Sequence, residues 1–376
     1  MNNADRSNDF LSKVLQLAVS LQASDVHASP GEPIHYRVDG KLQRESFPEL
    51  AQQRFSENLS HAFLDEILNP TQLQQLNHRG SVDGAYSLDK QHRFRFNAYR
   101  RNGQTCFAFR LLANVVPRLS ELGLDDRLYG LCDLTDGLIL VAGPTGSGKS
   151  TTIASLLDQI NRSRSSHIIT IEDPIEFVHL SNCSLVNQRQ VGTDVGTFNQ
   201  ALLDAVRQDP DVILVGELRD LDTIRTAITA AETGHLVFAS VHAGDCKTSI
   251  ERLISAFPTS EQDLAQRLVA TVMRTVIVQH LLPRQKNPNL DQADQQSTRV
   301  LASEVMHVNP GISNLIASAN LNQIASIIQT SGQEGMWTLD DSLARLWRAR
   351  QISEKTAMSL ARNPEILAQI SRRTRA

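Results

Sequence analysis

Hydrophobic and polar residues in the first 115 positions follow two different spacings. Apolar side chains recur at helical spacing between residues 10 and 21, which predicts an amphipathic helix. Residues 34–44 are predicted to form two short strands around Asp-Gly at positions 39 and 40, because this dipeptide suits a two-residue type I′ hairpin turn. A second hairpin is predicted for residues 92–112, where Phe and Arg alternate before an Asn-Gly turn. One helix and antiparallel hairpins together indicate a small α+β domain.

From residue 136 onward the pattern changes to short apolar runs separated by helical segments. Continuous apolar runs are typical of parallel strands that are covered on both faces, so this part indicates an α/β fold. The polar stretch after Pro117 separates the two patterns and predicts a linker at residues 116–135. The candidate strands are residues 138–142, 167–171, 212–215 and 236–240.

The C-terminal part carries a third pattern. Residues 284–299 are polar and nearly free of apolar anchors, so we expect a mobile loop there. Residues 300–376 have the pattern of a mainly helical region. A chain of 376 residues also exceeds the size at which one core usually stops growing. We therefore expect two domains, at residues 1–115 and 136–283, followed by the loop and the helical region.

Composition and charge exclude several functional classes. The 37 basic and 41 acidic residues give a net charge of −4, so nothing global indicates nucleic-acid binding. The four cysteines form neither a zinc pattern nor a disulfide framework, which fits a reducing cytoplasm.

The first residues lack the features of a signal peptide. Residues 268–282 are the most apolar long stretch, but Arg274 and His280 interrupt it and it is shorter than the roughly 20 residues of a membrane helix. We expect no direct membrane insertion.

Residues 143–150 fit the phosphate-loop pattern G-x-x-x-x-G-K-[ST] and follow directly on a predicted strand. A Gly-rich turn lets successive backbone N–H groups surround phosphate oxygens, where a helix N-terminus adds its positive end. In this pattern the lysine reaches the β- and γ-phosphates and the next hydroxyl binds Mg²⁺. An ordinary Gly-rich turn is the alternative, but the strand before and the apolar helix after disfavour it. The predicted nucleotide-binding residues are Gly143, Pro144, Thr145, Gly146, Ser147, Gly148, Lys149, Ser150 and Thr151.

Two other predicted strands end in acidic residues, which phosphoryl transfer needs for water and metal. Glu172 and Asp173 follow the strand at 167–171. Glu217 follows the strand at 212–215, in a segment that also holds Arg219 and resembles a Walker B strand with Glu in place of the usual Asp. Acids at strand ends can instead cap helices. Beside a phosphate loop, however, they favour a catalytic site.

His235 and His242 lie before and after the predicted strand at 236–240. A single His is more often a structural residue than a catalytic one. His242 ends a strand that we expect to be central, where the switch point of the sheet would bring it near the γ-phosphate. We therefore favour a functional role for His242, and leave His235 open between the two interpretations.

Four ordered motifs resemble those of the secretion ATPase superfamily, the ring-forming motors of type II and type IV secretion and of type IV pili. The phosphate loop resembles the Walker A motif of that family. Residues 171–179, 209–220 and 232–238 resemble its Asp box, Walker B motif and His box. The resemblance covers nearly the whole chain. The segments most similar to the pilus-retraction members are residues 23–27, 37–40, 93–99 and 335–340.

The resemblance implies a fold, an activity and an assembly. The fold would be a PAS-like α+β N-terminal domain followed by a RecA-like P-loop NTPase domain with a helical C-terminal region. The activity would be ATP hydrolysis that drives pilus retraction, in a homo-hexamer with ATP and Mg²⁺ between the two domains. The implied partner is an inner-membrane pilus or secretion platform protein. Through it, the cytoplasmic protein would lie at the inner face of the cytoplasmic membrane.

The same resemblance implies a role for individual residues. Lys149 and Ser150 would hold phosphates and Mg²⁺, and Glu172 would assist the metal and the water. Glu217 would be the catalytic carboxylate, and His242 would sense the γ-phosphate. The arginines that contact phosphate in the N-terminal domain of this family match Arg93, Arg95 and Arg110. From periodicity alone, these arginines would be the solvated face of a strand.

This chain departs from the retraction members of the family at several positions. Retraction motors carry Ala-Ile-Arg-Asn-Leu-Ile-Arg-Glu where residues 311–318 read Gly-Ile-Ser-Asn-Leu-Ile-Ala-Ser. His242-Ala243-Gly244 also replaces the usual His-Thr, and residues 284–299 are longer than expected. Assembly and type II secretion members generally have an extra N-terminal domain and a four-cysteine zinc motif, and neither is found in this sequence. The departures concern partner contact and the direction of the motor, and not ATP hydrolysis.

Two other functions stay open at this point. The chain could be a secretion or pilus-assembly ATPase of the same superfamily, or a structural subunit that binds nucleotide without hydrolysing it. A small-molecule kinase shares only the phosphate loop, and no obvious lid with clustered arginines follows.

Overall fold

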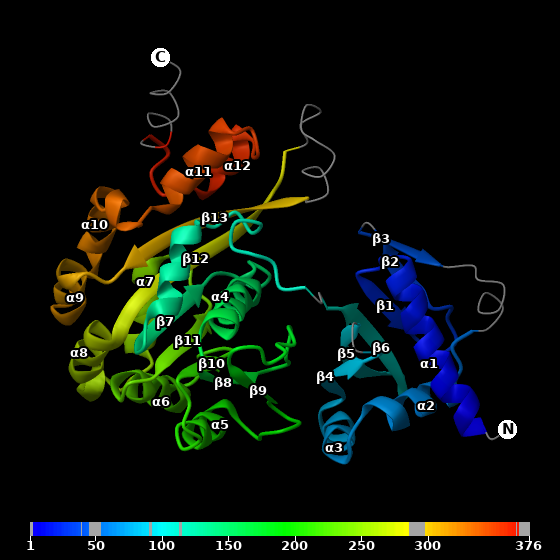
Figure 1. The fold of residues 1–376 in the computed structure, drawn as a ribbon. Coiled ribbons are helices and arrows are strands. Elements are labelled where there is room, and N and C mark those ends of the chain that lie inside the picture. The colour runs from blue at the N-terminus through cyan, green and yellow to red at the C-terminus, as the bar shows by residue number, and fades with distance from the viewer. Residues whose placement is uncertain are drawn as a thin grey trace. The chain divides into compact units, whose positions relative to one another are not determined.

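The computed structural model forms two compact units (Figure 1). It describes residues 3–38, 40–44, 54–89, 92–112, 115–285, 298–365 and 367. The first unit comprises Met1–Val115 with two later segments, Asp173–Val178 and Gln190–Asp194, and the second unit comprises Val116–Glu172, His179–Arg189 and Val195–Ala376. Each unit has its own cluster of buried apolar side chains.

Six strands among the described residues form the sheet of the first unit, in the order β3-β2-β1-β6-β5-β4 with antiparallel pairing throughout. The strands are β1 (Asp25–Ala28), β2 (His35–Val38), β3 (Lys41–Arg44), β4 (Ser81–Ser87), β5 (Arg93–Arg101) and β6 (Gln104–Leu111). The helices are α1 (Asn3–Ser20), α2 (Glu57–Ile67) and α3 (Pro70–Arg79). Helix α3 begins with a capping box between Asn69 and Gln72 and has Pro70 in its first turn, where proline is favoured.

The helix and both hairpins predicted for this part of the chain are confirmed. In the first hairpin Val38 pairs with Lys41, and Gly40 has a φ of +77°, while its neighbour at position 39 lies outside the described residues. In the second hairpin Arg101 pairs with Gln104, and Asn102 and Gly103 have φ values of +52° and +81°. Two consecutive positive φ values are what a type I′ turn needs. The sequence prediction missed β1 and β4, because one is short and the other has weak alternation.

An aromatic cluster forms the core of the first unit. Phe63 of α2 lies at its centre, with its ring centroid 5.1 Å from that of Phe55 and 5.5 Å from that of Phe107. Phe94 and Phe96 of β5 are buried in the same core. Because strand side chains alternate, Arg93 and Arg95 of β5 lie on the opposite face of the sheet.

Seven strands in the described part of the chain form the sheet of the second unit, in the order β13-β12-β7-β11-β10-β8-β9. The neighbours from β12 to β8 pair in parallel, and β13 is antiparallel to β12. The four strands predicted from the sequence are confirmed as β7, β8, β10 and β11. The strands are β7 (Gly137–Ala142), β8 (His167–Glu172), β9 (Leu185–Gln190), β10 (Val212–Val215), β11 (Leu236–Val241), β12 (Met273–Pro283) and β13 (Arg299–His307).

The C-terminal half contains more sheet than its sequence pattern predicts. Most of the apolar stretch at 268–282 is strand β12, and the first residues of the region expected to be mainly helical form its partner β13. The consecutive β-branched residues Val276, Ile277 and Val278 favour the strand. The backbone N–H of Arg284 donates to the carbonyl oxygen of Thr298. Most of the predicted polar loop, residues 286–297, lies outside the described residues.

Helices cover both faces of the second sheet (Figure 1). Helix α4 and the 3-10 helix η1 (Asp126–Asp133) pack against alternate residues of β7, β10 and β11. Helix α6 contacts β7 and β11, and α7 contacts β12. No helix among the described residues is both long and apolar enough to cross a bilayer. The other helices are α4 (Lys149–Ser163), α5 (Phe198–Ala205), α6 (Leu221–Glu232), α7 (Cys246–Ser255), α8 (Gln262–Val272), α9 (Pro310–Ala317), α10 (Ile324–Thr330), α11 (Leu339–Arg348) and α12 (Glu354–Leu360), with short 3-10 turns at Thr259–Glu261, Leu321–Gln323 and Gly332–Glu334.

Part of the segment predicted as a linker, residues 116–135, is packed into the core of the second unit. Leu119, Leu128 and Leu131 are buried there beside α4 and β7. The backbone N–H of Leu119 donates to the Tyr129 hydroxyl at 3.0 Å. The polar residues between these leucines conceal their spacing in the sequence, which is why the segment has the pattern of a linker.

We predict that Phe63→Ala lowers the free energy of unfolding by about 3–5 kcal/mol, because it removes the central ring of the aromatic cluster and leaves a cavity. Leu42→Ala is the matched control, since Leu42 is 50% exposed. Urea denaturation of the full chain, followed by circular dichroism, measures both variants. Equal midpoints for the two variants would contradict the assignment of Phe63 to the centre of the core.

Candidate functional site

The phosphate loop connects the fully buried strand β7 with helix α4. Its backbone turns at Gly143, Gly146 and Gly148, whose φ values are +147°, +76° and +90°. Gly148 is the N-cap of α4 and offers no side chain to the first N–H groups of the helix. Pro144, Thr145 and Ser150 are exposed, whereas Ser147 and Lys149 are buried. A helix N-terminus behind a Gly-rich turn is a ready anion-binding site.

Gly143 occupies a position where only glycine fits. A Cβ atom there would lie 2.4 Å from the carbonyl oxygen of Gln279 and 2.4 Å from the Ser147 hydroxyl. Strand β12 therefore packs directly behind the loop. Lys149 Nζ donates to the carbonyl oxygens of Gly143 and Pro144, each at 3.0 Å. The ammonium group is thus held inside the curve of the loop.

Gln279 of β12 is a part of this site that the sequence prediction missed. Its side chain is fully buried, and Nε2 donates to Thr152 Oγ1 at 2.6 Å. Its Oε1, like the Ser147 hydroxyl, has no hydrogen-bond partner among the described residues. Buried polar atoms without a protein partner are rare in folded proteins. The available signal was an amide inside the otherwise apolar run Val-Ile-Val-Gln.

The parallel pairing brings Glu172, Glu217 and His242 to the edge where the loop opens. Val241 pairs with Ala142, the last residue before the loop. Ala239 pairs with Val215, and Val215 with Ile171. The carboxyl ends of β7, β11, β10 and β8 therefore follow one another along one edge, which is where α/β sheets bind their ligands.

Glu217 and His242 are in direct contact at this edge. His242 Nε2 lies 3.1 Å from Glu217 Oε1, and Arg219 Nη2 lies 2.7 Å from Glu217 Oε2. The Glu217 side chain is 16% exposed and that of His242 is 34% exposed, so both can reach a ligand. The Ser240 hydroxyl donates to the carbonyl oxygen of Gly216 at 2.6 Å, which fixes the backbone before Glu217.

Glu172 ends β8, one strand further along the edge. Its Oε1 accepts hydrogen bonds from Thr170 Oγ1 at 2.7 Å and from Gln188 Nε2 at 3.0 Å. Gly216 packs against it, because a Cβ there would lie 3.4 Å from the Glu172 Cα. The adjoining Asp173 is exposed.

Ser150 and Glu172 supply oxygen atoms of the kind that Mg²⁺ prefers. In the described part of the chain no cluster of three His, Cys, Asp or Glu side chains could hold a metal by itself. Mg²⁺ usually takes only one or two protein oxygens and completes its shell with water and phosphate. The donors at this edge therefore fit a magnesium ion that is bound together with a triphosphate.

His235 lies at the opposite edge of the sheet. Its backbone carbonyl accepts from the N–H of Gly137, which begins β7. Its Nδ1 lies 2.9 Å from the carbonyl oxygen of Ala230, where it caps the end of α6. Within one chain His235 is therefore not brought together with the phosphate loop.

The three predicted arginines lie on one face of the sheet of the first unit. Arg95 and Arg110 are directly opposite each other across β5 and β6, and Asp25 is opposite Arg110 on the next strand. Asp25 accepts from Arg110 Nε at 2.8 Å and lies 3.8 Å from Arg37 Nε. Arg93 Nη2 donates to Gln190 Oε1 at 3.3 Å. Arg95 Nη2 lies 3.6 Å from Asp83 Oδ1. We call Arg93, Arg95 and Arg110 the arginine row. Together with Arg37 they lie beside two carboxylates, Asp25 and Asp83, so positive charges outnumber negative ones in this group.

Two buried cysteines are not candidates for nucleophilic chemistry. Burial raises the pKa of Cys132 to about 12, and burial together with the nearby Glu304 carboxylate raises the pKa of Cys246 well above its usual value. Both thiols therefore stay protonated, whereas the nucleophile in cysteine chemistry is the thiolate.

Comparison with known proteins identifies relatives over most of this chain. Residues 3–352 match a family model described as type II/IV secretion system protein. The type IV pilus retraction ATPase PilT of Pseudomonas aeruginosa is 40% identical over 355 residues, which cover 94% of this chain and 99% of PilT. A twitching motility protein of Neisseria gonorrhoeae is 36% identical over 88% of this chain and 85% of its own length.

A solved structure shares the fold. A crystal structure described as the pilus retraction motor PilT with bound ADP is 38% identical, with a TM-score of 0.84, and the match covers 95% of this chain and 98% of that one. The mixed α/β architecture is therefore that of a known ATPase.

Gly143→Ala and Gly146→Ala test the close packing of the loop against β12. Both substitutions place a side chain at a positive φ, which costs about 1–2 kcal/mol by itself. Only Gly143 also has atoms within 3 Å of the added methyl, whereas nothing lies within 4 Å at Gly146. We predict a loss of about 3 kcal/mol or more in unfolding free energy for Gly143→Ala, and about half of that or less for Gly146→Ala.

Denaturant unfolding of the two variants measures this difference. Similar losses for both would mean that β12 does not pack against the loop at Gly143.

Proposed function

Because the chain belongs to the type II/IV secretion system protein family, we propose that it is an ATPase motor that drives the retraction of a type IV pilus. The contact between Glu217 and His242, on the sheet edge where the phosphate loop opens, carries the catalytic part of this proposal. The likeness to retraction and twitching proteins over most of the chain supports the mechanical part.

The positions of the side chains suggest how each acts on ATP. The loop N–H groups and Lys149 bind the phosphates, and Glu217 orients a water molecule toward the γ-phosphate and accepts its proton. His242 contacts the γ-phosphate. Because His242 also contacts Glu217, the position of the Glu217 carboxylate depends on the presence of that phosphate. Mg²⁺, held through Ser150 and Glu172, would neutralise charge on the phosphate oxygens when it is bound. Arg219 holds the second oxygen of Glu217.

The arginine row of the first unit supplies further positive charge for nucleotide binding. Arg93, Arg95 and Arg110 bind nucleotide phosphate, as the excess of positive charge over Asp25 and Asp83 permits. Arginine suits this role because its planar guanidinium group binds two phosphate oxygens at once.

We also propose a domain fold and an assembly for this chain. The first unit is a PAS-like domain, which corresponds to residues 1–115, and the second is a RecA-like domain with its catalytic core in residues 136–283. The protein is a homo-hexamer at the cytoplasmic face of the inner membrane, where it binds a pilus or secretion platform protein. The similarity to a pilus retraction motor along nearly its full length supports this description.

A secretion or pilus-assembly motor is the second candidate, and helix α9 favours it. Ile312, Leu315 and Ile316 are buried and keep the apolar pattern of the retraction motif. Ser313, Ala317 and Ser318 replace its two arginines and its glutamate, and the Ser313 hydroxyl donates to the carbonyl oxygen of Ala270. Because the lost charges are the groups that would contact a partner, this helix would meet a different surface.

Glu217→Gln is expected to lower kcat for ATP hydrolysis by about 10²–10³-fold, because the amide cannot accept the proton of the attacking water. Binding of a fluorescent ATP analogue should change by less than about threefold, since the loop is untouched. Phosphate release by the purified full chain measures the first effect, and Glu232→Gln on the exposed end of α6 is the control.

Equal rates for wild type and Glu217→Gln would remove Glu217 from its role. Tight ATP binding without any phosphate release by the wild-type protein would instead indicate a structural nucleotide-binding subunit.

Deletion of the gene in the source cell tests the direction of the motor. A retraction motor predicts more surface pili and loss of twitching, because assembly then proceeds without removal. Electron microscopy counts the pili, and expression of the wild-type chain from a plasmid is the control. Loss of pili would favour an assembly motor, and an unchanged count with a secretion defect would favour a transport ATPase.

A further inference from the structure

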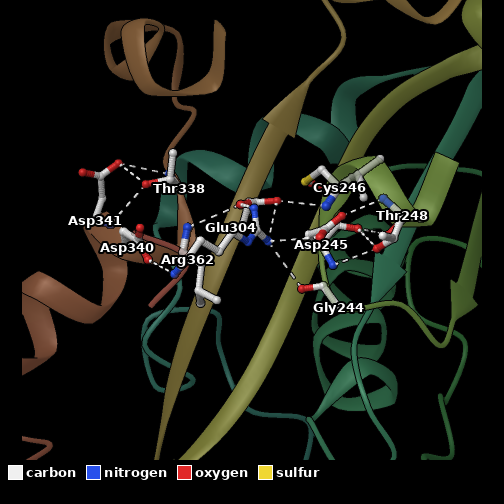
Figure 2. A network of polar contacts seen from close by, with 12 residues as sticks. Gly244, Asp245, Cys246, Thr248, Glu304, Thr338, Asp340, Asp341 and Arg362 are labelled. Atoms are coloured by element: carbon white, nitrogen blue, oxygen red, sulfur yellow. Dashed lines mark hydrogen bonds and ion pairs between the residues drawn. The ribbon is translucent and has the colours of Figure 1, made fainter. Parts of the chain in front are cut away.

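A buried carboxylate holds four parts of the second unit together (Figure 2). Glu304 of β13 is 1% exposed. Its Oε1 accepts the backbone N–H of Cys246, the first residue of α7, at 2.9 Å. Its Oε2 accepts the N–H of Leu339 at the start of α11 at 3.4 Å. The Arg362 guanidinium binds both oxygens, with Nη1 at 2.6 Å from Oε2 and Nη2 at 3.2 Å from Oε1.

A second carboxylate fixes the backbone that carries Arg362. The two oxygens of Asp340 accept the backbone N–H groups of Arg362 and Asn363, each at 2.9 Å. These residues follow α12, so Asp340 determines where the chain leaves that helix. The guanidinium of Arg362 is therefore aimed from a fixed base, although its side chain is 36% exposed.

Arg362 reaches the segment that follows His242. Its Nη2 donates to the carbonyl oxygen of Gly244 at 3.4 Å and lies 3.9 Å from Asp245 Oδ2. His280 Nε2 also lies 3.2 Å from the same carbonyl oxygen. Asp245 begins α7 with a capping box to Thr248. Arg362 thus holds the connection from β11 to α7 at Gly244, two residues after His242. Glu304 holds Cys246, the first residue of α7.

We propose that Arg362 is a positioning residue for the ATPase site. It fixes the connection 242–245, which we call the histidine loop, and thereby holds His242 against Glu217. This inference rests on the proposed ATPase function. The histidine loop has no apolar anchor of its own, since its residues are half-buried or exposed. A few polar contacts therefore determine its position: Arg252 Nη1 donates to the His242 carbonyl oxygen at 3.0 Å, His280 lies beside the Gly244 carbonyl oxygen, and Arg362 supplies the contact that comes from the C-terminal segment.

The guanidinium is suited to this task because it joins two negative groups at once. It binds the buried Glu304 through two N–H groups and still presents Nη2 to Gly244 and Asp245. A lysine keeps the charge that the buried carboxylate needs, but a single ammonium cannot reach both places. Arg362→Lys therefore separates the positioning role from the structural role of the ion pair.

The test compares Arg362→Lys with Arg345→Lys, an exposed arginine on α11, in the full chain. We expect hydrogen exchange at residues 242–248 to become at least about twice as fast in Arg362→Lys, with no change in α5 or in Arg345→Lys. We expect kcat to fall by about three- to tenfold with a KM for ATP within about twofold, because the substrate-binding loop is unchanged.

A double-variant cycle identifies the route of the effect. In a His242→Ala background, measured by single turnover with labelled ATP, Arg362→Lys should lower the rate by less than about 1.5-fold, since the histidine through which it acts is gone. Equal fold losses in the two backgrounds would overturn the proposal, as would unchanged exchange at residues 242–248. If the wild-type chain does not hydrolyse ATP, the proposed function fails, while the exchange comparison still decides whether Arg362 fixes the histidine loop.

Discussion

Parallel pairing of β7, β11, β10 and β8 is the constraint on which the rest of the structure depends. Parallel strands need a crossover between each pair, and the crossovers place helices on both faces of the sheet. All six residues of β7 and of β11 are buried for this reason. The same pairing makes every strand end at one edge, so residues far apart in the sequence meet there without any local signal between them. The contact of Glu217 with His242 is a direct consequence of this register.

The shape of the phosphate loop depends on its packing against this sheet. Gly143 turns at the end of β7 with its Cα against the backbone of β12, at a distance that excludes any side chain. The Lys149 ammonium then donates to two carbonyl oxygens of the loop, and Gln279 bonds Thr152 from behind. The buried charge is tolerated because it has partners, and the buried amide is satisfied through its Nε2. The loop is therefore held in a phosphate-binding shape by the strands themselves, which limits the reorganisation needed on binding.

The sequence was most informative where a short pattern has a single physical solution. The Asn-Gly turn at 102–103, the backbone turns at the glycines of residues 143–148 and the four buried strands were predicted correctly, because each depends on local sterics or continuous burial. Phosphate binding by these glycines stays a prediction. Gln279, β13 and the buried leucines of residues 119–131 were missed, since their roles come from contacts across the sheet or from polar neighbours that conceal their spacing. For His235 and His242 the sequence offered two similar residues on one strand. Only the direction of β11 separates them, because it puts them at opposite edges of the sheet.

The strands are held by apolar packing and the connections partly by polar contacts, and this difference indicates which parts of the second unit can respond to nucleotide. The strands are fixed by apolar side chains that are nearly all buried, and displacing one would expose a large area. The phosphate loop after β7 packs against β12 at Gly143, and the buried Leu218 anchors the connection after β10. The connection after β11 is fixed mainly by single hydrogen bonds and ion pairs, each with a net value of about 1 kcal/mol. A γ-phosphate that offers several charged oxygens competes on equal terms with such contacts, including those of Lys149 with its own loop. For the proposed ATPase, the response to ATP is therefore expected in the polar contacts of Lys149 and of the histidine loop, and in helix α7 that begins from that loop, while the sheet acts as the fixed frame.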